Sequence, residues 1–149
     1  MTADLPAIYV DTSAILRLLF GSPGVKAPLT RCVSTSSQLV VVEAYRVVDR
    51  ARLAGRLNDL ETARKHRELR SLLDRMHLFP VADEVIEAAQ GAFSIPLSAL
   101  HALHAATARV IFEEAGPLAF WTHDTAQAAA AVTLGLVVRG IKGEDEPIA

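Results

Sequence analysis

The chain has 149 residues, with 51% hydrophobic and 21% charged residues and a formal net charge of −2, which excludes a disordered protein and suffices for one hydrophobic core. Its single cysteine, Cys32, excludes a disulfide framework and a cysteine-rich zinc site. The length suits one domain, which we expect to cover residues 1–149. The sequence shows neither a signal-peptide pattern nor an apolar run of the roughly 20 residues that span a bilayer, so we expect a cytoplasmic protein.

Short apolar segments alternate with longer helical patterns along the chain. A strand at 7–10 leads into a helix at 12–20, and helical spacing follows over 36–55 and 57–76. The alternation indicates an α/β domain with a mostly parallel sheet. The acidic residues at about 141–149 form a tail that could be flexible. The rest of the chain predicts, in order, a strand at 77–81, helices at 83–91 and 97–114, a strand at 118–122, a helix at 124–134 and a strand at 136–139.

Two aspartates follow predicted strands. Asp11 comes directly after the strand at 7–10, and Asp124 comes shortly after the strand at 118–122. In a parallel α/β sheet, ligands bind outside the carboxyl ends of the strands, so both carboxylates are candidates for a site. Each aspartate also precedes a predicted helix, and capping of that helix is the alternative role. Ser13 and Thr125 are further candidates for these two caps.

Glu43 lies inside the predicted helix 36–55, among valine, leucine and alanine neighbours. A carboxylate in such surroundings needs a cation or a metal ion, unless it is simply exposed. Oxygen ligands that converge at strand ends suit Mg²⁺ or Mn²⁺. Such an ion lowers the pKa of bound water and neutralises a phosphate under attack, which would suit hydrolysis of a phosphodiester.

Charge is distributed unevenly along the chain. From Arg46 to Arg75 there are nine Lys/Arg and five Asp/Glu, a local excess of +4, whereas from Met76 onward there are three and nine, a local excess of −6. The basic middle could attract phosphate groups, or it could be an ordinary solvated helix surface.

Four segments carry a resemblance to a known family. They are YVDTSAIL (9–16), LVVVEAYRVVDR (39–50), LSALHALHAATA (97–108) and WTHD (121–124). None is specific alone, but in this order and at these separations the chain resembles PIN-domain proteins, in particular VapC-type toxin ribonucleases of type II toxin–antitoxin systems. Together with the strand–helix order, the segments cover nearly the whole chain.

The resemblance implies a three-layer α/β/α sandwich with a mostly parallel sheet of four or five strands. It also implies RNA cleavage with Mg²⁺ or Mn²⁺ held by acidic residues. By this likeness Asp11, Glu43 and Asp124 are catalytic and metal-binding. Ser13 and Thr122 would support the site through hydrogen bonds to carboxylates or water. The partners that it implies are a second copy of the chain, in a homodimer, and a cognate VapB-like antitoxin.

The sequence departs from the family pattern at His101, where an aspartate is expected. Three outcomes are open. His101 could ligate the metal ion as a neutral imidazole, which would favour Mn²⁺ or another transition metal over Mg²⁺. It could contact phosphate as a cation, or its presence could weaken the site so that the protein binds without efficient cleavage. His104, three residues further on, is expected to be a packed helix residue, although the spacing also fits a two-histidine metal site.

Two surface predictions follow from the resemblance. Arg46 and Arg50 follow Glu43 on one helix and are candidates for contacts with the RNA backbone. The helix predicted at 12–20 is apolar on almost every side, so it is either fully buried or covered by a partner. The candidates for an antitoxin groove are Leu16, Leu19 and Phe20.

Two other functions compete with a nuclease toxin. One is a PIN-fold module that binds RNA or antitoxin with weak or no nuclease activity because His101 replaces an acidic ligand. The other is a receiver domain, which would pair acidic residues near its N-terminus and carry a late lysine. Here only Asp4 precedes Asp11 among the acidic residues, and Lys142 lies in the tail.

Overall fold

A parallel sheet forms the centre of the protein, as seen in a computed structural model that describes residues 7–21 and 32–140. Its five strands lie in the order β3-β2-β1-β4-β5, and every neighbouring pair is parallel. This confirms the predicted α/β class. The strands are β1 (Ala7–Val10), β2 (Val33–Ser37), β3 (His77–Phe79), β4 (Ala119–Trp121) and β5 (Val137–Arg139).

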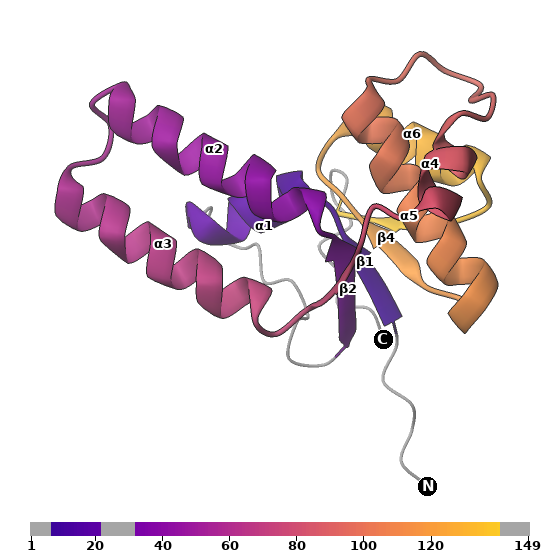
Figure 1. Ribbon diagram of the computed structural model, residues 1–149, viewed down its shortest axis with the longest axis horizontal. Coiled ribbons are helices and arrows are strands. Elements are labelled where there is room, and N and C mark those ends of the chain that lie inside the picture. The colour runs from indigo at the N-terminus through magenta and orange to yellow at the C-terminus, as the bar shows by residue number, and fades with distance from the viewer. Residues whose placement is uncertain (1–6, 22–31, 141–149) are drawn as a thin grey trace, which may run out of the picture.

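Helices cover both faces of the sheet and complete an α/β/α sandwich. In Figure 1, α1, α2 and α3 lie on one side of the strands, and α4, α5 and α6 lie on the other. The helices α2 and α3 pack against each other as a hairpin that projects beyond the sheet. The helix bounds are α1 (Thr12–Leu19), α2 (Leu39–Leu53), α3 (Asp59–Leu73), α4 (Asp83–Ala89), α5 (Ala99–Ala115) and α6 (Thr125–Thr133).

The prediction of one helix over 36–55 was wrong at its start, because Ser36 and Ser37 belong to strand β2. The error has a physical cause. Hydroxyl side chains replace apolar ones in this central strand because they bond to the neighbouring backbone. Thr35 Oγ1 donates to the carbonyl of Ile8 at 3.1 Å, and Ser36 Oγ donates to that of Val10 at 2.6 Å.

Alternation along β1 sends its side chains into two hydrophobic cores. Ile8 and Val10 pack with residues of α1, α2 and α3, whereas Tyr9 points to the opposite face and packs with residues of α5 and α6. The Tyr9 ring also stacks on Phe120, with ring centroids 5.0 Å apart. This places the hydroxyl of Tyr9 beneath α5, close to the end of β1.

The first helix is neither fully buried nor exposed on one whole face. Ala14, Ile15 and Leu19 are buried, Arg17 is exposed, and the side chain of Phe20, just after the helix, remains 40% exposed. The acidic tail predicted at about 141–149 lies outside the described residues. Among the helices that the structure describes, none is long and apolar enough to cross a membrane.

Candidate active site

Asp11 lies where β1 ends and α1 begins, and it is almost fully buried, with 4% exposure. Its Oδ1 accepts hydrogen bonds from Ser13 Oγ at 2.7 Å and from the backbone N–H of Ala14 at 3.1 Å, so Asp11 rather than Ser13 caps the helix. Its Oδ2 accepts from Thr122 Oγ1 at 2.5 Å. Burial raises the pKa of Asp11, and these three hydrogen bonds offset the rise only in part.

The loop between β4 and α6 is tied to the same carboxylate. Thr122 Oγ1, which donates to Asp11, also accepts from the backbone N–H of Asp124 at 3.0 Å. Ser13 Oγ accepts from the backbone N–H of His123 at 2.9 Å. Two hydroxyl groups thus fix the position of the second aspartate relative to the first.

Asp124 caps α6, since its Oδ1 accepts from the backbone N–H of Gln127 at 2.8 Å. Its Oδ2 lies 3.7 Å from Nε2 of His101, and both side chains are 36% exposed. Gln127 is fully buried and donates through Nε2 to the backbone carbonyl of His101 at 3.0 Å. The amide of Gln127 therefore holds the first turn of α5 against α6, and with it the imidazole of His101 beside Asp124.

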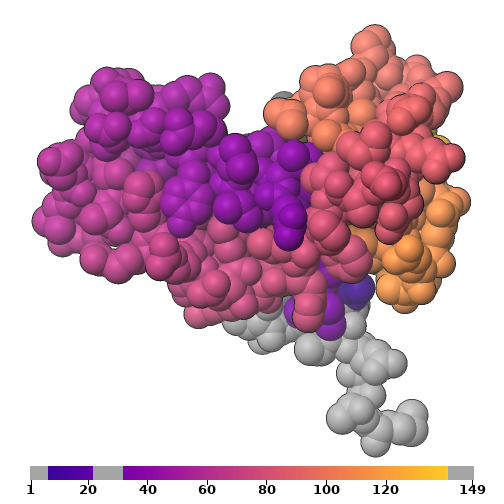
Figure 2. Space-filling view, in the orientation of Figure 1, coloured from indigo at the N-terminus to yellow at the C-terminus, as the bar shows by residue number. Residues whose placement is uncertain are grey.

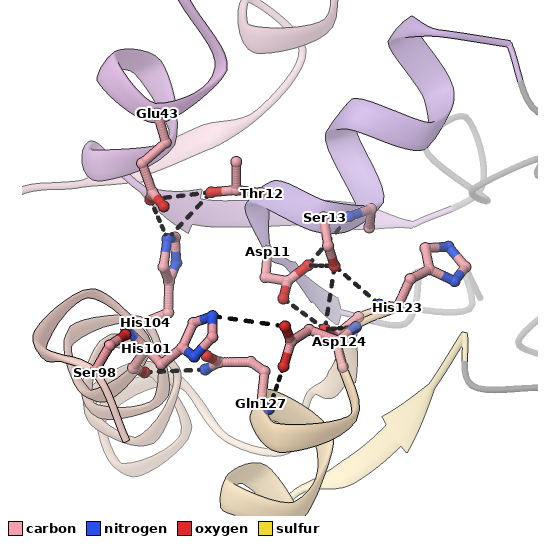
Figure 3. A network of polar contacts seen from close by, with 12 residues as sticks. Asp11, Thr12, Ser13, Glu43, Ser98, His101, His104, His123, Asp124 and Gln127 are labelled. Atoms are coloured by element: carbon pink, nitrogen blue, oxygen red, sulfur yellow. Dashed lines mark hydrogen bonds and ion pairs between the residues drawn. The ribbon is translucent and has the colours of Figure 1, made fainter. Parts of the chain in front are cut away.

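Glu43 reaches the site from α2, the helical layer on the other face of the sheet (Figure 3). Its Oε1 accepts from Thr12 Oγ1 at 3.0 Å and lies 2.6 Å from Nε2 of His104. Partial burial raises the pKa of Glu43, but the hydrogen bonds from His104 and Thr12 favour the ionised carboxylate and leave the pKa below its usual value.

Sequence reasoning missed the polar role of His104. The residue is buried, with 2% exposure, as a packed helix residue would be, yet both ring nitrogens have partners. Nε2 contacts Glu43, and Nδ1 lies 2.7 Å from the hydroxyl of Tyr9. The available signal was weak: a tyrosine inside an otherwise aliphatic strand, and a histidine on an alanine-rich helix face.

The predicted acidic residues and His101 face one space between α2 on one side and α5 and α6 on the other (Figure 3). Their side chains are divided among three local networks, centred on Asp11, on Asp124 with His101, and on Glu43 with His104. Within the described ranges, no three histidine, cysteine, aspartate or glutamate side chains are grouped as a ready metal site.

The donor chemistry nevertheless fits Mg²⁺ or Mn²⁺, because the three carboxylates offer hard oxygen ligands. The partly uncompensated burial of Asp11 also favours a nearby cation. Binding would need carboxylate oxygens that are not already occupied by hydrogen bonds. The Oε2 atom of Glu43 is available for this, since none of the residues that the structure describes hydrogen-bonds to it.

A groove of about 440 Å³ opens beside Glu43. The surface is notched between the purple α2 and the coral segment of α4 and α5 in Figure 2. Arg46 and Arg50 both line the groove, and Arg46 also pairs with Asp49 at 3.2 Å. Its other lining residues are Thr12, Ser13, Leu16, Leu39, Val42, Val47 and Leu100.

The three residues suggested for an antitoxin groove lie in different places. Leu16 lines the groove beside Glu43. Phe20 lines a second hollow of about 280 Å³, whose wall includes Val47, shared with the first groove, and Arg56. Leu19 lines a third hollow of about 480 Å³, although it is 1% exposed and belongs to the hydrophobic core.

Comparisons with known proteins agree with this architecture. The family model for the PIN domain matches residues 8–132. Ribonuclease VapC46 of Mycobacterium tuberculosis is 33% identical over an alignment of 138 residues, and the match covers 90% of this chain and 97% of that protein. The crystal structure of PAE2754 from Pyrobaculum aerophilum is similar with a TM-score of 0.59 at 20% identity, over 93% of this chain and 92% of that chain, a likeness of fold alone.

Proposed function

This chain belongs to the PIN-domain family and is of the VapC type, and from that premise we propose that it is a metal-dependent endoribonuclease, the toxin of a type II toxin–antitoxin module. One observation carries the proposal. In a chain one-third identical to a named ribonuclease, Asp11, Glu43 and Asp124 come from separate elements and face one space at the carboxyl edge of a parallel sheet. We further propose that residues 1–149 form one PIN domain and act in the cytoplasm.

The three carboxylates would hold Mg²⁺ or Mn²⁺. When bound, the ion would lower the pKa of a water molecule and neutralise charge on the scissile phosphate. The chain supplies the arrangement: Ser13 and Thr122 orient Asp11 through hydrogen bonds, and Asp124 is fixed as the cap of α6. Preorganised ligands of this kind reduce the ordering that metal binding demands.

His101 occupies the position where the family pattern has an acidic residue, and we propose that its imidazole is a fourth metal ligand. Its position beside Asp124, 3.7 Å from Oδ2, supports this role. An imidazole donor favours Mn²⁺ relative to Mg²⁺. Calorimetric titration should therefore show a shift of preference toward Mg²⁺ in His101→Asp. Unchanged affinity in His101→Ala would remove His101 from the ligand set.

Cleavage of RNA by purified protein, free of antitoxin, tests the function. Structured RNAs would be incubated with Mn²⁺, Mg²⁺ or EDTA, with Asp11→Asn as the matched variant. We expect cleavage that needs a divalent ion and that is lost in the variant. RNA binding without cleavage under every metal would instead establish the non-catalytic module. Growth arrest on expression, relieved by a co-expressed small partner, tests the toxin role.

We propose that the groove beside Glu43 binds two partners, RNA and an antitoxin. Arg46 and Arg50 lie one and two turns from Glu43 on the same helix and would contact the RNA backbone. The apolar lining, which includes the 64% exposed Val42 and the 44% exposed Leu100, would receive a segment of a VapB-like antitoxin.

We propose a homodimer as the active assembly, to be tested by light scattering of the purified chain.

A further inference from the structure

A buried chain of polar groups connects the core of the protein to Glu43. The hydroxyl of Tyr9 lies 2.7 Å from Nδ1 of His104, and Nε2 of the same ring lies 2.6 Å from Glu43 Oε1. Tyr9 is 0% exposed and His104 is 2% exposed. The three residues belong to β1, α5 and α2, so these contacts join a strand of the sheet to α5 and join α5 directly to α2 in the other helical layer.

The direction of donation follows from the partners. An ionised carboxylate only accepts, so the hydrogen in the contact with Glu43 belongs to Nε2 of His104. Burial raises the pKa of Tyr9 well above its usual value, and the charge of Asp11 adds to the rise, so the phenol keeps its proton. An imidazole that carries its single hydrogen on Nε2 accepts at Nδ1, where the Tyr9 hydroxyl lies. The donations therefore run from Tyr9 to His104 to Glu43.

We propose that His104 and Tyr9 are positioning residues for the metal site, holding Glu43 by Oε1 so that Oε2 is presented to the ion. This inference rests on the proposed function. Both hydrogen bonds to the glutamate, from His104 and from Thr12, end on Oε1. Glu43 would otherwise sample many rotamers at the mouth of the groove, and ordering it on binding would weaken metal affinity.

The alternative is that His104 merely fills space between α5 and β1. Packing does not require donors or acceptors, whereas here each nitrogen meets a complementary group at 2.6–2.7 Å. In Figure 3 the ring of His104 bridges the gap between its own helix and Glu43 on the opposite wall. A positioning role and a packing role therefore predict different results when one nitrogen is replaced at a time.

Two variants separate the nitrogens. In His104→Gln the amide nitrogen can take the place of Nε2 and still donate to Glu43. In His104→Asn the amide oxygen can take the place of Nδ1 and accept from Tyr9, but the donor to Glu43 is lost. Both replace the ring by a smaller amide, and Asn is smaller than Gln by one methylene, so the extra loss of packing in His104→Asn must be measured separately. The full chain would be titrated with Mn²⁺ in the absence of RNA, with thermal unfolding in EDTA as a measure of folding.

We expect His104→Asn to weaken Mn²⁺ binding by about 10- to 100-fold, the usual effect of losing such a partner, and His104→Gln to retain most of the affinity. Equal losses in the two variants, or no loss in either, would overturn the positioning role. A wild-type protein that binds no Mn²⁺ would refute the proposed function together with this inference. Wild-type binding with no difference between the two variants would refute the inference alone.

Tyr9→Phe provides a test that changes no volume in the core beyond one hydroxyl. Removing the donor to Nδ1 should change the tautomer balance of His104, which the ¹⁵N chemical shifts of its ring report in metal-free protein. We expect nitrogen shifts of a single Nε2–H tautomer in wild type and of a tautomer mixture in the variant. Identical shifts in the two proteins would overturn the role assigned to Tyr9.

Discussion

Neutralising two carboxylates of the same pocket should change the stability of the protein in opposite directions. Glu43→Gln removes the charge from an acceptor that receives bonds from His104 and Thr12. The Glu43 side chain is only 22% exposed, so water does little to weaken these bonds. Hydrogen bonds to charged groups contribute about 1.5–3 kcal/mol and neutral ones about 0.5–1.5 kcal/mol, so the variant should lose about 1 kcal/mol. For a chain of this size that corresponds to a Tm lower by about 2–4 °C.

Asp11→Asn should have the opposite sign at neutral pH. The pKa of Asp11 is raised in the folded protein, so the stability it contributes is present below the unfolded pKa and is lost as pH rises through the folded pKa. Near pH 7 the ionised carboxylate therefore destabilises the fold, and an amide that keeps the helix cap should raise Tm. For Glu43 the pKa is lowered, so its contribution is present above the unfolded pKa and is lost as pH falls through the folded pKa.

Thermal unfolding followed by circular dichroism, in EDTA, measures both effects. At pH 7 we expect Asp11→Asn above wild type and Glu43→Gln below it. Both differences should shrink as the buffer is taken down through the carboxyl range. Changes of Tm with the same sign at pH 7 would contradict the opposite pKa shifts of Asp11 and Glu43, and would refute the stabilities derived from them.

Three other perturbations test separate parts of the account. Thr122→Val deletes a buried donor to a carboxylate and should lower the free energy of unfolding by about 1–3 kcal/mol, so an unchanged urea midpoint would contradict its role. Arg50→Gln should weaken RNA binding and reduce the salt slope by about 1, whereas Arg70→Gln on α3 should not; equal effects would rule out a local contact. Val42→Asp should weaken antitoxin binding in gel filtration more than Leu53→Asp, a comparably exposed residue at the far end of α2, and an equal effect would place the antitoxin elsewhere.

The parts of the structure that depend on local pattern could be predicted from the sequence. Strand β1 was predicted with its observed bounds, because four apolar residues end at a polar one. Asp124 was expected either to cap a helix or to serve a site, and the structure shows that one of its oxygens is free from the capping role. The order of strands and helices indicated the parallel sheet, which the structure contains.

The parts that depend on tertiary contacts could not be predicted in the same way. Strand β2 reads VSTSS, and its hydroxyl groups satisfy the backbone of β1, which local hydrophobicity does not reveal. The partners of His104 lie 61 and 95 residues away, so no spacing rule connects them. Whether Leu16 or Leu19 faces the groove depends on how α1 is rotated against the sheet, and the rotation buries Leu19.

A crystal soaked in manganese tests the central claim most directly, because the anomalous signal locates the ion itself. We predict an anomalous peak in the space enclosed by Asp11, Glu43 and Asp124, with oxygens of all three as ligands. A well-diffracting, fully soaked crystal with no peak there, and with each carboxylate still bonded only to its present neighbours, would contradict the account.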